Sequence, residues 1–109
     1  FGNSTVTVAH SRSKDLEKLC LDSDIIISAI GIPEFIKGNM IKKGSSIIDV
    51  GITRVDDLSS PKGYRIVGDV DFKSVSNTVG YITPVPGGVG PMTIAMLLKN
   101  TLKACEILD

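Results

Sequence analysis

The chain has 109 residues, of which 42% are hydrophobic and 22% are charged, so it is long enough to bury the core of one small domain. Twelve basic and twelve acidic residues cancel, and this balance provides no positive field to attract nucleic acid or an anionic membrane. No apolar run approaches the length of a bilayer span. Because the two cysteines lack CxxC spacing and the chain has one histidine, we expect two buried free thiols and no structural metal.

The first half of the chain alternates extended and helical patterns. β-Branched residues predict the strands, and apolar residues at helical spacing predict the short helices. The expected strands lie at residues 5–10, 25–30 and 45–50. One expected helix begins at Ser13 or Lys14, and a second spans residues 34–41. The second strand is apolar at almost every position, as is typical of a parallel strand covered on both faces. These repeated units predict the doubly wound α/β class.

The second half is less regular at first. Charges, Pro61 and Gly63 predict a surface loop over residues 53–64. A short strand over residues 65–70, a brief helix over 71–78, a strand over 81–85 and a final helix over 94–108 follow. The final helix has one apolar face, so we expect it to dock through that face.

The last strand and the last helix are joined by residues 84–91, Pro-Val-Pro-Gly-Gly-Val-Gly-Pro. The glycines permit backbone conformations closed to other residues, and Pro91 suits the first position of a helix. Such a loop lets main chain approach a ligand, and the helix start directs unpaired N–H groups toward it. This predicts a site for an anionic or polar ligand. The alternative is that the glycines serve only the turn.

Other strand ends could line the same crevice. Gly31 and Gly51 follow apolar strands, where a missing side chain lets a cofactor approach the backbone. Ser11 and Arg12 follow the first strand, and their hydroxyl and guanidinium groups suit a 2′-phosphate, which favours NADP over NAD. The alternatives are that Ser11 or Ser13 merely caps the next helix, that Arg12 is solvated, and that both glycines occupy ordinary turns.

Three aspartates and the single histidine are candidates for chemistry. Asp69 and Asp71 are two residues apart, a spacing that could serve acid–base catalysis or a divalent cation. Asp71 instead fits a helix N-cap, and we expect Asp49 and Asp69 to bond backbone N–H groups of loops. His10 has no evident nucleophile partner and is expected to be structural.

Four motifs follow one another along the chain, at residues 10–12 (HSR), 49–52 (DVGI), 67–72 (VGDVDF) and 81–93 (YITPVPGGVGPMT). Together they resemble the C-terminal, NAD(P)-binding part of the methylenetetrahydrofolate dehydrogenase/methenyltetrahydrofolate cyclohydrolase family, over nearly the whole chain. The resemblance implies a Rossmann-like, doubly wound, mainly parallel sheet. We expect residues 1–109 to be a partial NAD(P)-binding domain of a larger two-domain enzyme. The family's opening βα unit, with its Gly-Arg-Ser segment, and its substrate-side domain, with the catalytic lysine and tyrosine, are then missing.

The resemblance also implies a function. The intact enzyme would oxidise 5,10-methylenetetrahydrofolate with NADP, or NAD, and hydrolyse the methenyl product to 10-formyltetrahydrofolate, in one-carbon metabolism and purine biosynthesis. Ser11 and Ile52 match cofactor-contact positions, and Thr93 would add a hydroxyl beside them. The wall between folate and nicotinamide would be formed by Pro86, Gly87, Gly88, Val89, Gly90 and Pro91.

No residue of the chain is a candidate catalytic acid or base. The family implies a cytoplasmic or mitochondrial homodimer that acts on tetrahydrofolate derivatives. Two alternatives remain, a non-catalytic α/β ligand-binding or assembly module and a dehydrogenase with a different substrate.

Overall fold

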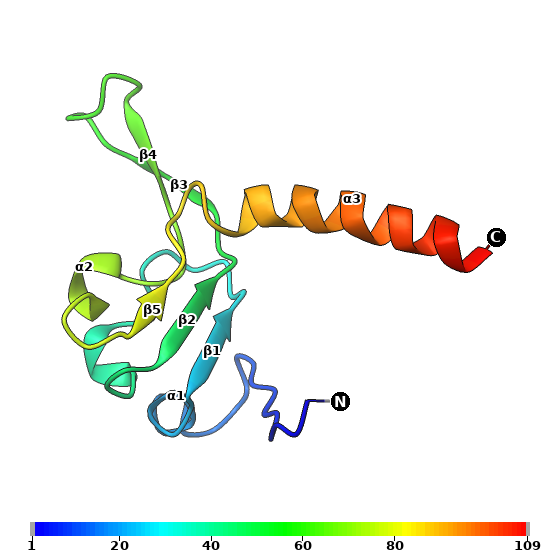
Figure 1. Ribbon diagram of the computed structural model, residues 1–109. Helices are drawn as coiled ribbons and strands as arrows, with labels where there is room; N and C mark the ends of the chain where they lie inside the picture. Colours follow the sequence, from blue (N-terminus) through cyan, green and yellow to red (C-terminus); the bar gives the residue numbers. More distant parts are fainter. Residues whose placement is uncertain (1, 109) are drawn as a thin grey trace.

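A parallel sheet forms the centre of the computed structural model, which describes residues 2–108 (Figure 1). Its strands are β1 (Ile25–Ser28), β2 (Ser46–Asp49) and β5 (Tyr81–Ile82), in the order β1-β2-β5. Both pairings are parallel, with Ile26 beside Ile47 and Ile47 beside Ile82. The prediction of an α/β fold with a mainly parallel sheet is confirmed, although each strand is shorter than the pattern predicted.

Short helices contribute to one core with the sheet. They are α1 (Leu16–Leu21), the 3₁₀ turn η1 (Gly38–Met40) and α2 (Phe72–Val75). The predicted helix over residues 34–41 is therefore a single 3₁₀ turn. The buried apolar residues of the core are Cys20, Ile26, Ile36, Ile41, Ile47, Val70 and Val75.

Strand β1 is covered on one face, so the expectation of two covered faces is wrong for the described residues. Ile26 is buried, whereas Ile25 and Ile27 are 63% and 67% exposed. Successive side chains of a strand point to opposite faces, and α1, η1 and α2 contribute side chains to the core that holds Ile26. The apolar run therefore correctly indicated a parallel strand, but it did not show that only one face of the strand is covered.

The N-terminal segment does not form the predicted strand. Residues 4–10 are exposed and belong to no ladder. A strand requires a neighbour to take its N–H and C=O groups, and within residues 2–108 none lies beside this segment. It ends in a turn in which His10 N–H donates to Ser13 Oγ (2.8 Å) and Arg12 N–H donates to His10 Nδ1 (3.1 Å). His10 thus has the structural role expected of it.

Helix α1 begins at Leu16, later than predicted, because Asp15 before it has a left-handed backbone with φ 54°. No side chain caps the helix. Neither Ser11 nor Ser13 is therefore its N-cap. Ser13 instead closes the preceding turn.

An antiparallel hairpin replaces the loop predicted over residues 53–64. Strands β3 (Thr53–Asp56) and β4 (Tyr64–Val67) pair with Thr53 beside Val67, and the hairpin projects from the body (Figure 1). The Arg54 guanidinium lies 3.8 Å from the centre of the Tyr64 ring. The loop signals, Pro61 and Gly63, belong to the connection between the strands.

Helix α3 (Val89–Leu108) begins before the predicted Ile94 and extends away from the sheet (Figure 1). Ile94, Leu97 and Leu98 on its apolar face are 64%, 65% and 69% exposed. The docking expectation is therefore wrong within residues 2–108. Cys105 on this helix is also exposed, contrary to prediction, whereas Cys20 is buried as expected.

The projecting helix and hairpin make the molecule elongated. Its radius of gyration is 16.4 Å, compared with about 13 Å for a compact domain of this length. Within the described residues, neither α3 nor any other helix has the length and hydropathy needed to cross a bilayer.

Candidate functional site

The carboxyl ends of the parallel strands meet the glycine-containing loop, residues 83–88, that leads into α3 (Figure 1). Gly87 has φ 92°, in the left-handed region that disfavours side chains. Gly88 does not have positive φ, but a Cβ there would overlap the Pro84 carbonyl oxygen and lie 3.1 Å from Thr83 Cβ. Gly88 is therefore required by the packing of the loop itself. A Cβ on Gly90, in the first turn of α3, would meet no atom within 4 Å.

A cavity of about 380 Å³ lies between this loop and the end of β2. Its lining residues are Asp49, Val50, Ile52, Pro84, Val85, Pro86, Gly87, Gly88, Val89, Gly90, Pro91 and Thr93. The structure thus brings together Ile52, Thr93 and all of residues 86–91, as the sequence predicted. It adds Asp49, Val50, Pro84 and Val85, whose signal was their position within the motifs at residues 49–52 and 81–93.

The polar groups at this cavity are few. The Thr93 hydroxyl donates to the Val89 carbonyl oxygen (2.9 Å), so its oxygen can still accept a hydrogen bond from a ligand. Ile52 is 67% exposed and offers an apolar surface. The first turn of α3 supplies N–H groups without intrahelical acceptors. Pro91 is at the third position of this helix, not the first, where its missing N–H group still costs no intrahelical bond.

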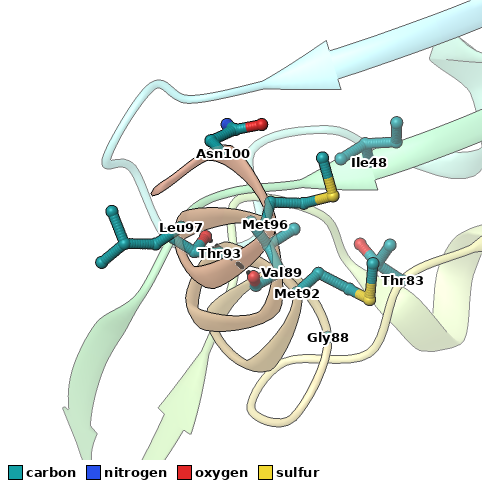
Figure 2. Close-up of a pocket in the computed structure, with 9 residues that line it drawn as sticks. All are labelled: Ile48, Thr83, Gly88, Val89, Met92, Thr93, Met96, Leu97 and Asn100. Atoms are coloured by element: carbon teal, nitrogen blue, oxygen red, sulfur yellow. Dashed lines mark hydrogen bonds between the residues drawn. The ribbon is translucent and has the colours of Figure 1, made fainter. Parts of the chain in front are cut away.

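A second hollow of about 610 Å³ adjoins the first at the start of α3 (Figure 2). It shares Gly88, Val89 and Thr93 with the first cavity. Figure 2 shows the thioethers of Met92 and Met96 beside the Ile48 and Thr83 side chains. Its lining contains no charged side chain.

The Asp49 carboxylate, at the end of β2, is 3% exposed. It accepts three backbone N–H bonds of 3.0 Å each, from Gly51, Asp69 and Val70. The Asp49 backbone N–H group in turn donates to Thr83 Oγ1 (2.9 Å), which links the end of β2 to the segment after β5. The expectation that Asp49 bonds loop N–H groups is confirmed.

Asp69 is fully buried and braces the segment after β1. Its carboxylate accepts from Ile30 N–H (2.6 Å), Gly31 N–H (3.0 Å) and Ser28 Oγ (3.2 Å). Asp71, by contrast, caps α2 by accepting from Ser74 N–H (3.1 Å). Both roles agree with the sequence-based expectations. No group of three or more His, Cys, Asp or Glu side chains in residues 2–108 is arranged as metal ligands.

Four predicted site residues lie outside the cavity lining. Gly31 has φ 78° and donates its N–H group to Asp69. Gly51 is buried, and a Cβ there would overlap the Asp69 carboxylate. Glycine at position 51 is thus required by a protein side chain. Ser11 and Arg12 are exposed in the turn after the N-terminal segment, and no ion pair within the described residues occupies the Arg12 guanidinium.

A parallel sheet whose strand ends face a glycine-containing loop and the start of a long helix defines the class of Rossmann-like, nucleotide-cofactor-binding α/β proteins. Within that class, the family described as "Tetrahydrofolate dehydrogenase/cyclohydrolase, NAD(P)-binding domain" matches residues 2–108. The chain belongs to this family.

Three similar proteins illustrate the relationship. The bifunctional protein FolD of Flavobacterium johnsoniae is 65% identical over 103 residues, which are 94% of this chain and 35% of that protein. The crystal structure of the bifunctional enzyme FolD, a methylenetetrahydrofolate dehydrogenase/cyclohydrolase from Campylobacter jejuni, is 48% identical with a TM-score of 0.84, covering 97% of this chain and 36% of that one. The Trypanosoma brucei enzyme, solved with NADP cofactor and an inhibitor, is 52% identical with a TM-score of 0.80, covering 91% and 34%. The chain therefore spans about a third of the length of these relatives.

Proposed function

We propose that the chain is the NADP-binding part of a larger bifunctional enzyme. The intact enzyme oxidises 5,10-methylenetetrahydrofolate with NADP and hydrolyses 5,10-methenyltetrahydrofolate to 10-formyltetrahydrofolate. The observation that supports this most directly is the cavity in which residues 84–91 face Val50, Ile52 and Thr93. The similar proteins described as bifunctional dehydrogenase/cyclohydrolases support the reaction itself.

The residues at the cavity fit a dinucleotide. Ile52 offers an exposed apolar side chain at a strand end, which suits one face of a nicotinamide ring. The space beside Gly90 is open to a ligand, and the first turn of α3 supplies free N–H donors. The Thr93 oxygen can accept a bond from the carboxamide of a nicotinamide.

Each part of the chain has a distinct role in this proposal. When bound, NADP supplies the hydride acceptor. Ile52 and Thr93 orient the nicotinamide, and residues 86–91 form the wall that the folate contacts and from which water is excluded. Ser11 and Arg12 bind the 2′-phosphate, because a hydroxyl and a free guanidinium are its natural partners. Gly31 and Gly51 shape the strand ends from behind the cavity.

The acid–base chemistry belongs to groups outside this chain. Asp49 and Asp69 are buried, and their carboxylates are already bonded to N–H and O–H donors. Neither is therefore free to transfer a proton to a substrate. On family resemblance, the intact enzyme is also proposed to be a cytoplasmic homodimer, which sedimentation and fractionation would test.

The test uses the intact protein. NADP should bind saturably in a calorimetric titration, and NADP reduction, followed by absorbance, should depend on 5,10-methylenetetrahydrofolate. A non-catalytic assembly module would show no saturable NADP binding. Reduction of NADP with another substrate, but not with the folate, would overturn the proposed reaction and leave the cofactor assignment intact.

A further inference from the structure

Two buried aspartate–glycine pairs cross beneath the candidate cofactor site. The Asp49 carboxylate occupies the space that a Cβ on Gly68 would take, and the Asp69 carboxylate occupies the space that a Cβ on Gly51 would take. Each aspartate lies within two residues of the glycine that makes room for the other, since Gly51 is two residues after Asp49 and Gly68 directly precedes Asp69. The two pairs therefore form one interlocked unit.

We infer that Asp49 and Asp69 are positioning residues that hold three strand-end segments in the arrangement needed to bind the dinucleotide. Asp69 fixes the segment after β1 through Ile30 and Gly31. Asp49 fixes the segments after β2 and β4 through Gly51 and Val70. This inference rests on the proposed function, because it assigns these segments to a cofactor site.

The unit reaches the cavity through short lengths of backbone. Ile52 directly follows Gly51, whose N–H group is held by Asp49 and whose α-carbon faces Asp69. Val50, on the other side of Gly51, also lines the cavity and donates its N–H group to the Ser28 carbonyl oxygen (2.8 Å). A shift of Gly51 would therefore move both apolar residues of this wall.

The bonding pattern specifies carboxylates and not amides. Within residues 2–108, every hydrogen bond to the two side chains comes from an N–H or O–H donor. An asparagine has one acceptor oxygen, and its NH₂ group would face a donor that cannot accept from it. Asp69→Asn would thus leave Ile30 or Gly31 without its acceptor, although the side chain has almost the same size.

The experiment compares Asp69→Asn with wild type in the intact enzyme. We expect the Kd for NADP, measured by titration, to rise by about tenfold or more, and kcat at saturating NADP and folate to stay within about twofold. Asp71→Asn is the matched control, since it makes the same chemical change two residues away at a helix cap that asparagine also serves. Its Kd should equal that of wild type.

A size exchange tests the interlock itself. Gly51→Ala should weaken NADP binding because its methyl group cannot coexist with the Asp69 carboxylate. Adding Asp69→Ser should then cause no further loss, since the carboxylate has already been displaced. Independent, additive losses would show that the two residues do not act as a unit and would overturn the inference.

Other outcomes are equally decisive. A wild-type Kd for Asp69→Asn, or equal losses of kcat and NADP affinity, would refute the positioning role. If Asp69→Asn does not fold, Ser28→Ala removes one donor to Asp69 and should raise the Kd about threefold, and an unchanged Kd would refute the inference. If the wild-type protein binds NADP but does not reduce it with 5,10-methylenetetrahydrofolate, only the proposed reaction is overturned. The comparison of Kd values would still test the positioning role of Asp49 and Asp69.

Discussion

Replacing Gly90 with alanine should separate the stability of the fold from the use of the cavity. Gly90 lies in the first turn of α3, and an added Cβ would meet no atom within 4 Å. Alanine is favoured over glycine inside a helix by up to about 1 kcal/mol, and by less at an end. We therefore expect the free energy of unfolding to rise by about 0.5 kcal/mol, which raises Tm by about 1–2 °C in a protein of more than 150 residues.

Function should change in the opposite direction. Gly90 lines the cavity of about 380 Å³, so a methyl group there takes space that the proposed folate and nicotinamide need. Adding a methyl group to a filled, well-packed site costs about 1–3 kcal/mol. This corresponds to a loss of roughly 5- to 150-fold in affinity.

The assay is the KM for 5,10-methylenetetrahydrofolate in the NADP reduction reaction of the intact enzyme, with thermal unfolding measured on the same samples. Gly88→Ala is the control, because its methyl group would strike the Pro84 carbonyl oxygen and should lower Tm. A Gly90→Ala enzyme that melts higher and keeps the wild-type KM would refute the assignment of this cavity to the ligands.

Three further predictions concern other parts of the chain. Ser11→Asp in the intact enzyme should weaken NADP binding by about 1–3 kcal/mol and affect NAD much less, because like charge would stand beside the 2′-phosphate; equal losses in a titration would remove this assignment. In the 109-residue chain, iodoacetamide should modify exposed Cys105 before Cys20, since burial raises the pKa of the Cys20 thiol and the thiolate is the reactive form. Peptide mass spectrometry after timed labelling gives the order, and labelling of Cys20 first would contradict this prediction. The Ser59 hydroxyl bonds Asp57 (2.5 Å) and lowers the pKa of that carboxyl, so the resulting stabilisation is present above the unfolded-state pKa and is lost as pH falls through the lower folded-state value. Ser59→Ala should return the pKa of Asp57 toward its ordinary value in an NMR titration, and no change would contradict the hydrogen-bond cause.

The parts of the fold that the sequence predicted correctly depend on strong local patterns. Residues 25–30 and 45–50 are rich in β-branched residues, and these segments became the parallel strands β1 and β2. The aspartates at strand ends were predicted to bond backbone N–H groups because such groups lack partners there, and Asp49 and Asp69 do so. The loop at residues 84–91 was predicted to be a ligand site because it is long and unusual. It lines a cavity, and its role in binding stays a prediction.

The parts that were missed depend on neighbours that a local pattern does not contain. Residues 5–10 have strand propensity, but a strand also needs a partner, and none is present within residues 2–108. The apolar face of α3 predicted docking, but a hydrophobic pattern does not identify the surface against which the helix packs. The hairpin was missed because the charges of residues 53–64, with Pro61 and Gly63, suggested a loop, whereas Arg54 packs on Tyr64 across the strands.

The glycines show why a motif alone does not identify ligand contacts. Gly51 and Gly88 were both assigned to ligand approach, but the atoms that exclude a side chain there are the Asp69 carboxylate and the Pro84 carbonyl oxygen. These glycines serve the two walls of the cavity, one held by the buried aspartates and the other by the packing of the loop. Asp49 joins the walls, since its carboxylate bonds Gly51 and its N–H group bonds Thr83 Oγ1. The spacing between Ile52 and the glycine-containing loop is therefore set by Asp49, which also lines the cavity, and by buried Asp69, which a bound cofactor would not need to touch.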